Sequence, residues 1–193
     1  MKENLSGLTI VGCLALLLYL SLISFFPSPL HSQVTLDGTL GTSGSVNGPN
    51  YNIGSSLGQL TGSNLFFSFG TFNIMANESA TFSGPASVTN VISRITGGSA
   101  STIDGKLSCT ISGANFFLIN PYGIVFGKDA ALDVKGSFYA TTANYILLGD
   151  GGRFDASKPE NSVLTVAPPP SAFGFLDMSH AGGYSSIKVD GAF

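Results

Sequence analysis

Five aspartates could supply acid–base or metal-binding chemistry: Asp104, Asp129, Asp133, Asp150 and Asp155. Two carboxylates facing each other across a sugar would hydrolyse a glycosidic bond, and several oxygen ligands together would hold a calcium ion. No two of these aspartates stand at a spacing that requires such a site. Asp104-Gly105 and Asp150-Gly151 are typical of turns. The carboxylates therefore give little support to catalysis or metal binding.

Three other residues carry reactive or charged side chains. His180 has no serine or aspartate around it in a recognisable catalytic frame. Arg94 is the only arginine before Arg153, and it suits a clamp on backbone carbonyls better than an electrophilic role. Cys109 is the only cysteine after the N-terminal apolar segment, which excludes a disulfide or cysteine-based metal site there. We expect Cys109 to be a buried packing residue, and we expect no enzyme activity, cofactor or metal ion.

Composition predicts an all-β fold. The 193 residues include 25 glycines and 15 phenylalanines, and only 10% are charged. This balance favours turns and buried aromatic side chains over helices. The net charge is −3 without a basic cluster, so nucleic-acid binding is excluded.

Residues 1–32 differ from the rest of the chain. Leu8 to Phe26 is almost wholly apolar, and Pro27 and Pro29 end any helix there. We interpret the segment as a cleaved signal peptide that is removed near Gln33. The alternative is an uncleaved membrane anchor, since the apolar run is long enough to cross a bilayer.

Asn120-Pro121-Tyr122-Gly123 is the strongest turn signal in the chain. Asparagine, proline and glycine suit the first, second and fourth positions of a type I turn. The apolar runs Phe116–Ile119 and Ile124–Phe126 flank it and indicate strands covered on both faces. The turn therefore forms either a buried hairpin or a corner between two strands.

Short apolar segments recur between turn residues from Val34 onward. A period of two is clear in Leu132-Asp133-Val134-Lys135, which indicates a half-buried strand. Two architectures fit this pattern, an antiparallel sandwich and a parallel β-helix. The expected strands are Leu65–Phe72, Val88–Ile95, Ile103–Leu107, Phe116–Ile119, Ile124–Phe126, Leu132–Val134, Phe138–Ala140 and Tyr145–Leu148.

The C-terminal part changes character. Pro168-Pro169-Pro170 cannot donate ladder hydrogen bonds, so it is an edge or a polyproline-like bridge. Ile187-Lys188-Val189-Asp190 then alternates like the beginning of another strand. We expect residues 177–193 to start a further β-helix coil of a longer passenger.

Five motifs follow one another along the chain: Gly62 to Phe69, Asn90 to Gly98, Ser101 to Gly105, Ala114 to Gly127 and Gly136 to Ala143. In this order they resemble the two-partner secretion (TPS) domain of filamentous haemagglutinin-like exoproteins. The resemblance covers most of the chain after the N-terminal segment and implies a right-handed parallel β-helix over residues 33–176. It also implies N-terminal capping strands and short antiparallel extra-helical elements.

The same resemblance implies a function in protein secretion. The chain would use the general secretion machinery and then be recognised in the periplasm by the POTRA domains of an outer-membrane β-barrel transporter. It would reach the cell surface or medium of a Gram-negative-type cell as a monomer, and would seed β-helix folding of an adhesin-like passenger. The rival interpretations are a carbohydrate-binding or carbohydrate-active β-helix protein and a free-standing adhesin.

The recognition residues implied by the resemblance are Asn120, Pro121, Tyr122, Gly123 and Ile124, with Asn64 and Leu65 as a possible second segment. The family signature Asn-Pro-Asn-Gly-Ile is met except at Tyr122. A type I turn tolerates most residues at its third position, so the turn survives this change. The change bears only on contacts that the missing asparagine would make with the transporter.

Overall fold

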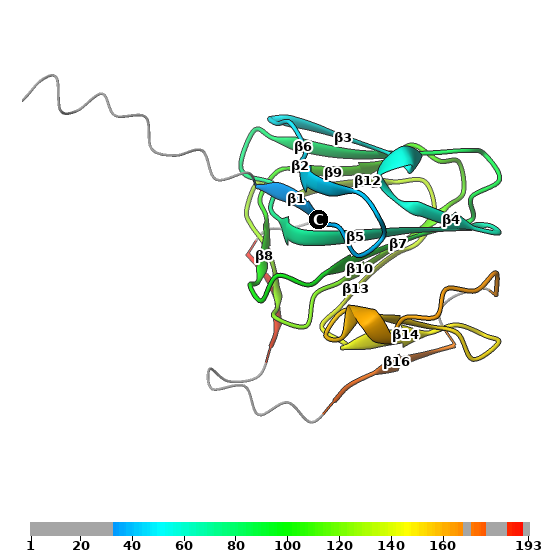
Figure 1. Ribbon diagram of the computed structural model, residues 1–193. Helices are drawn as coiled ribbons and strands as arrows, with labels where there is room; N and C mark the ends of the chain where they lie inside the picture. Colours follow the sequence, from blue (N-terminus) through cyan, green and yellow to red (C-terminus); the bar gives the residue numbers. More distant parts are fainter. Residues whose placement is uncertain (1–32, 168–170, 177–184, 191–193) are drawn as a thin grey trace, which may run out of the picture. The chain divides into compact units, whose positions relative to one another are not determined.

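The computed structural model describes residues 33–167, 171–176 and 185–190. The predictions for residues 1–32, for the triple proline and for His180 lie outside these residues. The chain winds through about four turns of a β-solenoid, in which successive strands pass from one sheet to the next (Figure 1). The parallel β-helix prediction is confirmed, and the antiparallel sandwich is excluded.

Each coil adds one strand to each of up to three parallel sheets. The β3 sheet holds β3 (Asn50–Gly54), β6 (Ser79–Ser83), β9 (Lys106–Cys109) and β12 (Ala131–Val134). The β5 sheet holds β5 (Asn64–Phe72), β7 (Asn90–Ile95), β10 (Asn115–Ile119) and β13 (Phe138–Thr141). The β11 sheet holds β8 (Ser101–Ile103), β11 (Ile124–Phe126) and β17 (Ile187–Val189).

The N-terminal end of the solenoid is closed by antiparallel strands. β1 (Val34–Asp37) and β4 (Gln59–Thr61) pair with different halves of β5, and β2 (Ser43–Ser45) pairs with β1. A short 3₁₀ turn, η1 (Ser55–Leu57), connects β3 to β4. These strands cover the backbone edge that β5 would otherwise expose, and they confirm the expected N-terminal cap.

A second antiparallel sheet lies outside the coils. It comprises β14 (Tyr145–Leu147), β15 (Arg153–Asp155) and β16 (Ala172–Gly174), in the order β15-β14-β16, with η2 (Pro159–Asn161) after β15. We call the part of the chain that forms this sheet, residues 144–176, the excursion. Its apolar side chains pack on Phe66, Ile92 and Phe117 of the β5 sheet. The expected extra-helical elements are therefore present.

The excursion explains why the strands of the β5 sheet read as continuous apolar runs. In β10, Phe116 and Leu118 point into the solenoid core, whereas Phe117 and Ile119 point outward under the excursion. Because both faces are buried, both sets of side chains are apolar. The core itself is rich in phenylalanine rings, and Phe82 contacts Phe116 edge-on at 4.7 Å between ring centroids. Cys109 is fully buried in this core, as predicted.

One predicted strand is wrong. Ile103–Leu107 was expected as a single strand, but the chain turns at Asp104-Gly105 and divides the segment between β8 and β9. Gly105 is required at this corner because a Cβ would lie 2.4 Å from the carbonyl oxygens of Met75 and Glu78. Apolar residues on both sides of the corner face the same core, and this hides the break in the sequence pattern.

Candidate functional site

The segment Asn120–Gly123 forms a corner between two sheets. β10 precedes it in the β5 sheet, and β11 follows it in the β11 sheet, so the hairpin alternative is wrong. The amide of Gly123 donates to the carbonyl of Asn120 at 3.1 Å, which closes the expected four-residue turn. We call residues 120–123 the Asn120 corner.

Asn120 is completely buried, and its side chain points into the molecule. Its Nδ2 amide donates to the Ser99 carbonyl and to the Ser101 hydroxyl, each at 3.0 Å, in the preceding coil. Its Oδ1 accepts from the Tyr122 amide at 2.9 Å. The side chain therefore fixes the turn and ties it to the neighbouring coil.

The other side of the corner receives the chain when it returns from the excursion. The Ser185 hydroxyl donates to the Pro121 carbonyl, and the Ile124 amide donates to the Ser186 carbonyl at 3.1 Å. Gly123 has a φ of +116°, and a Cβ there would lie 3.2 Å from the Ser186 oxygen. Glycine is therefore favoured by backbone conformation and by this close approach.

Asn64 and Leu65 occupy a different part of the β5 sheet. Asn64 is buried and donates to the Thr165 and Ala167 carbonyls at 3.2 and 2.7 Å, while Leu65 points into the core. Asn64 is in register with Asn90 and Asn115, at the opposite strand end from the Asn120 corner. At ~3.3 Å per residue, five residues separate the two positions by roughly 16 Å along the strand direction alone. The structure does not bring the two candidate segments together.

Arg94 lies at the junction of the cap, the β5 sheet and the excursion. It is 1% exposed and donates to the Ser68 hydroxyl at 2.7 Å and to the Thr39 hydroxyl at 2.8 Å. It also donates to the Asp155 carbonyl and the Ser162 hydroxyl, each at 2.6 Å. Only one of these partners, the Asp155 carbonyl, belongs to the expected clamp on backbone carbonyls. The three hydroxyl partners come from distant segments that the sequence gives no reason to combine.

No carboxylate in the described part of the chain bonds directly to Arg94. Burial lowers the pKa of Arg94 to about 10, against the opposing influence of Asp37, Asp155 and Glu160. The guanidinium also lies 4.3 Å from the centroid of the Phe154 ring. Its hydroxyl, carbonyl and ring partners therefore supply much of the stabilisation that water would give.

Asp37 extends this polar junction into the cap. Its carboxylate accepts hydrogen bonds from the Ser68 and Thr96 hydroxyls at 2.6 and 2.7 Å, and from the amide and hydroxyl of Thr39 at 2.9 and 2.8 Å. Burial alone would raise the pKa of Asp37, but these hydrogen bonds outweigh it and the pKa is lowered. We call Asp37, Thr39, Ser68, Arg94 and Thr96 the Arg94 junction.

The lowered pKa of Asp37 predicts an acid-sensitive cap. A carboxylate with a depressed folded-state pKa stabilises the fold above its unfolded pKa, near 3.8, and this stabilisation is lost as pH falls through the folded pKa. We expect Asp37→Asn to lower the free energy of unfolding at neutral pH but to flatten its dependence on pH below about 4. Urea unfolding of both chains between neutral pH and about pH 3 measures this difference. Parallel pH profiles for the two chains would contradict the assignment.

Of the five aspartates considered for catalysis, Asp104 and Asp129 are neighbours and the other three are dispersed. Asp104 accepts from the Asp129 amide, and Asp133 is paired with Lys106 and Lys135 on the exposed side of β12. Asp150 accepts from the Gly152 amide and the Thr165 hydroxyl, and Asp155 is buried against Arg153. Among the described residues, no three His, Cys, Asp or Glu side chains gather into a possible metal site.

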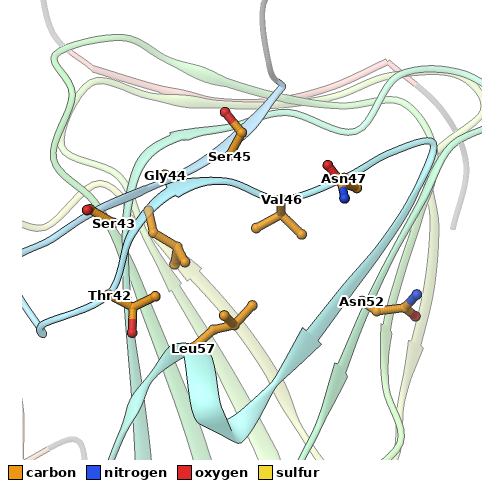
Figure 2. A pocket seen from close by; sticks show the side chains of 9 residues that line it. Thr42, Ser43, Gly44, Ser45, Val46, Asn47, Asn52 and Leu57 are labelled. Carbon is orange, nitrogen blue, oxygen red and sulfur yellow. The ribbon is translucent and has the colours of Figure 1, made fainter.

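A hollow of about 370 Å³ opens at the cap, between β2, the following loop and β3 (Figure 2). Its hydroxyl and amide side chains are Thr42, Ser43, Ser45, Asn47 and Asn52. Aliphatic side chains of Leu36, Val46 and Leu57 form the rest of its wall. Its lining side chains are neutral, so the hollow contains no acid or base at the wall.

In the part of the chain that the structure describes, no helix is long and apolar enough to cross a membrane.

Comparisons with known proteins agree with this architecture. The family model described as TPS secretion domain matches residues 32–181. The heme/hemopexin-binding protein of Haemophilus influenzae is 32% identical over 88 residues, which are 46% of this chain and 9% of that protein. The chain thus matches less than a tenth of this relative's length. None of the solved structures matches the chain.

The family match includes the cap, the excursion and all the strands from β1 to β16. Proteins of this family leave Gram-negative cells through the periplasm with an outer-membrane partner. The chain belongs to the family of TPS secretion domains.

Proposed function

We propose that the chain directs its own export by binding the periplasmic POTRA domains of a partner outer-membrane barrel, and then seeds β-helix folding outside the cell. Residues 1–32 would direct passage through the general secretion machinery and then be removed. Residues 33–176 would be recognised as the secretion domain, and the domain would act as a monomer.

The observation that carries the seeding role is the difference between the two ends of the solenoid. Antiparallel β1 and β4 cover β5 at the first end, whereas β12, β13 and β17 are the last strands of their sheets among the residues that the structure describes. Leu132 of β12 is 36% exposed even though its neighbours Leu107 and Val134 pack in the core. An open rung with apolar side chains is a template on which another coil can stack.

The Asn120 corner and Ile124 are the proposed recognition residues, with Asn64 and Leu65 as a second segment. The side chains of Asn120 and Asn64 are buried, so in the folded domain they would act by shaping the backbone around them. Tyr122 keeps part of its side chain exposed. We therefore place recognition before the chain has completed its fold, when the outward side of the corner is accessible.

A binding titration tests this proposal. Purified periplasmic domains of the partner barrel should bind the chain, and Asn120→Ala should weaken binding by at least about tenfold, the equivalent of 1.4 kcal/mol. Tyr122→Asn restores the family residue at an indifferent turn position, so it should strengthen binding at unchanged unfolding midpoint. Asn144→Ala removes a buried asparagine in the excursion and serves as the control. Equal affinities for all four chains would reject the recognition residues.

The last residues of the chain bear on the passenger. We propose that residues 177–193 begin the next coil, since β17 pairs in parallel with β11. An adhesin-like passenger fits such a continuing solenoid. The relative's name concerns heme and hemopexin, but the match covers only 9% of that protein, so this ligand is not part of our proposal.

A further inference from the structure

The lengths of chain that separate a strand from the next strand of its sheet differ greatly within the solenoid. In the β5 sheet, Phe116 pairs with Phe138, and in the β3 sheet Lys106 pairs with Ala131. Ser101 of β8 pairs with Ile124 of β11 in the same way. Ile124, however, pairs next with Ile187, because the whole excursion lies between them. The edge of β11 is therefore synthesised and exported long before its own partner strand.

The partner strand binds β11 mainly through its backbone. The Ile124 amide donates to the Ser186 carbonyl at 3.1 Å, and the Asp190 amide donates to the Phe126 carbonyl at 2.8 Å. Ile187 and Val189 remain 42% and 50% exposed. A strand held in this way contributes little apolar burial, so another extended segment can replace it.

The Asn120 corner forms the entrance to this edge. The Pro121 carbonyl accepts from the Ser185 hydroxyl, and the missing side chain of Gly123 leaves room for the Ser186 carbonyl. Asn120 holds the corner from inside through Ser99 and Ser101. The corner and the β11 edge together accept an extended parallel strand that begins with two small residues.

We infer that the β11 edge with the Asn120 corner is a strand-acceptor site used twice during export. It first accepts an extended segment of the partner's periplasmic domain, and Ser185–Asp190 of the chain then displaces that segment. This inference rests on the proposed function, and it adds the surface and the type of contact. An unpaired edge invites aggregation, so occupation by the partner would also protect the chain until its own strand arrives.

A peptide-binding experiment on the whole chain tests the acceptor site. The parallel ladder places the Lys188 and Asp190 amides on β11 carbonyls, so Lys188→Pro with Asp190→Pro should release the chain's own strand. A fluorescent peptide with the sequence of Ser185–Asp190 should then bind this double variant and not the unmodified chain. Val189→Pro is the matched control, because the Val189 amide points away from β11 and the native strand stays in place.

Two glycine substitutions locate the site of binding. In the double variant, Gly123→Ala should weaken peptide binding by at least about tenfold, since it adds backbone strain and obstructs the entrance. Gly98→Ala introduces a similar strain at φ +81°, with nothing within 4 Å of the added carbon, and should leave binding unchanged. The proposed site would be overturned if Gly123→Ala left peptide binding unchanged. It would also be overturned if the peptide did not bind a double variant whose circular dichroism spectrum still showed intact sheet.

The last part of the experiment adds the partner's periplasmic domain to the complex of peptide and double variant. It should displace the labelled peptide from the double variant. Binding of the domain without displacement would overturn this inference while leaving the proposed function intact, whereas no binding of the domain at all would reject the proposed function.

Hydrogen exchange supplies an independent readout that needs no substitution. In the unmodified chain the Ile124 amide, bonded to Ser186, should exchange at least about tenfold faster than the Asn120 amide, bonded to the Thr141 carbonyl. Equal exchange rates would show that β17 is not replaceable and would overturn the inference even if the double variant fails to fold.

Discussion

Arg94→Ala is expected to lower the free energy of unfolding by at least about 3 kcal/mol, because four hydrogen bonds from a buried charged donor are lost together. The change removes the hydrogen bonds by which the Arg94 side chain links Thr39 of the cap, Ser68 of β5 and Ser162 of the excursion. It also leaves the buried Asp155 carbonyl without this donor. Urea unfolding followed by far-ultraviolet circular dichroism measures the loss.

Lys106→Ala is the control for removing a positive charge. Lys106 pairs with Asp133 at 3.0 Å on the surface, and about half of each side chain is exposed. Exposed ion pairs of this kind contribute about 0–1 kcal/mol. A similar loss in the two variants would show that Arg94 acts only through net charge and would contradict its role as the centre of the junction.

Asn120→Ala is expected to destabilise the chain by about 3 kcal/mol, at about 1 kcal/mol for each of three side-chain hydrogen bonds. One of these bonds fixes the turn, and the other two reach Ser99 and Ser101 in the preceding coil. The unfolding midpoint in urea gives the magnitude directly.

Asn73→Ala provides a comparison within the same fold. Asn73 lies where the first coil leaves β5, just before Ile74 bridges Ile103 of the β11 sheet, and its side chain accepts one bond, from the Thr102 amide at 2.8 Å. Its replacement should therefore cost about 1 kcal/mol. If Asn120→Ala costs no more than Asn73→Ala, the bonds from the Asn120 side chain to the preceding coil do not contribute.

The sequence predicts a tight turn at Asn120–Gly123 because the relevant information is local, whereas the choice between a hairpin and a corner depends on how the flanking strands pair. Proline and glycine select the turn, and the apolar runs on either side select two buried strands. The partners of the Asn120 side chain lie 19 and 21 positions earlier, in another coil. Turn propensity carries no information on such contacts, so sequence alone predicts only the bond to the Tyr122 amide.

The strands that escaped prediction have polar or short sequences. β6 is Ser79-Ala-Thr-Phe-Ser83, with two apolar side chains facing the core and hydroxyls facing outward. Its identity as a strand depends on pairing with β3 and β9 on either side. Arg94 presents the same difficulty, because Thr39, Asp155 and Ser162 approach it only after the cap and the excursion have packed on the β5 sheet.

The most direct measurement of the proposed secretion role is the fraction of the chain found in the medium of cells that do or do not produce the partner barrel. We expect secretion in cells with the barrel and retention of the processed chain, beginning near Gln33, in the periplasm of cells without it. Periplasmic retention of the processed chain in cells that produce the barrel would show that the N-terminal segment works while the step that needs the partner fails. Equal amounts of chain in the medium of both kinds of cell would contradict the account.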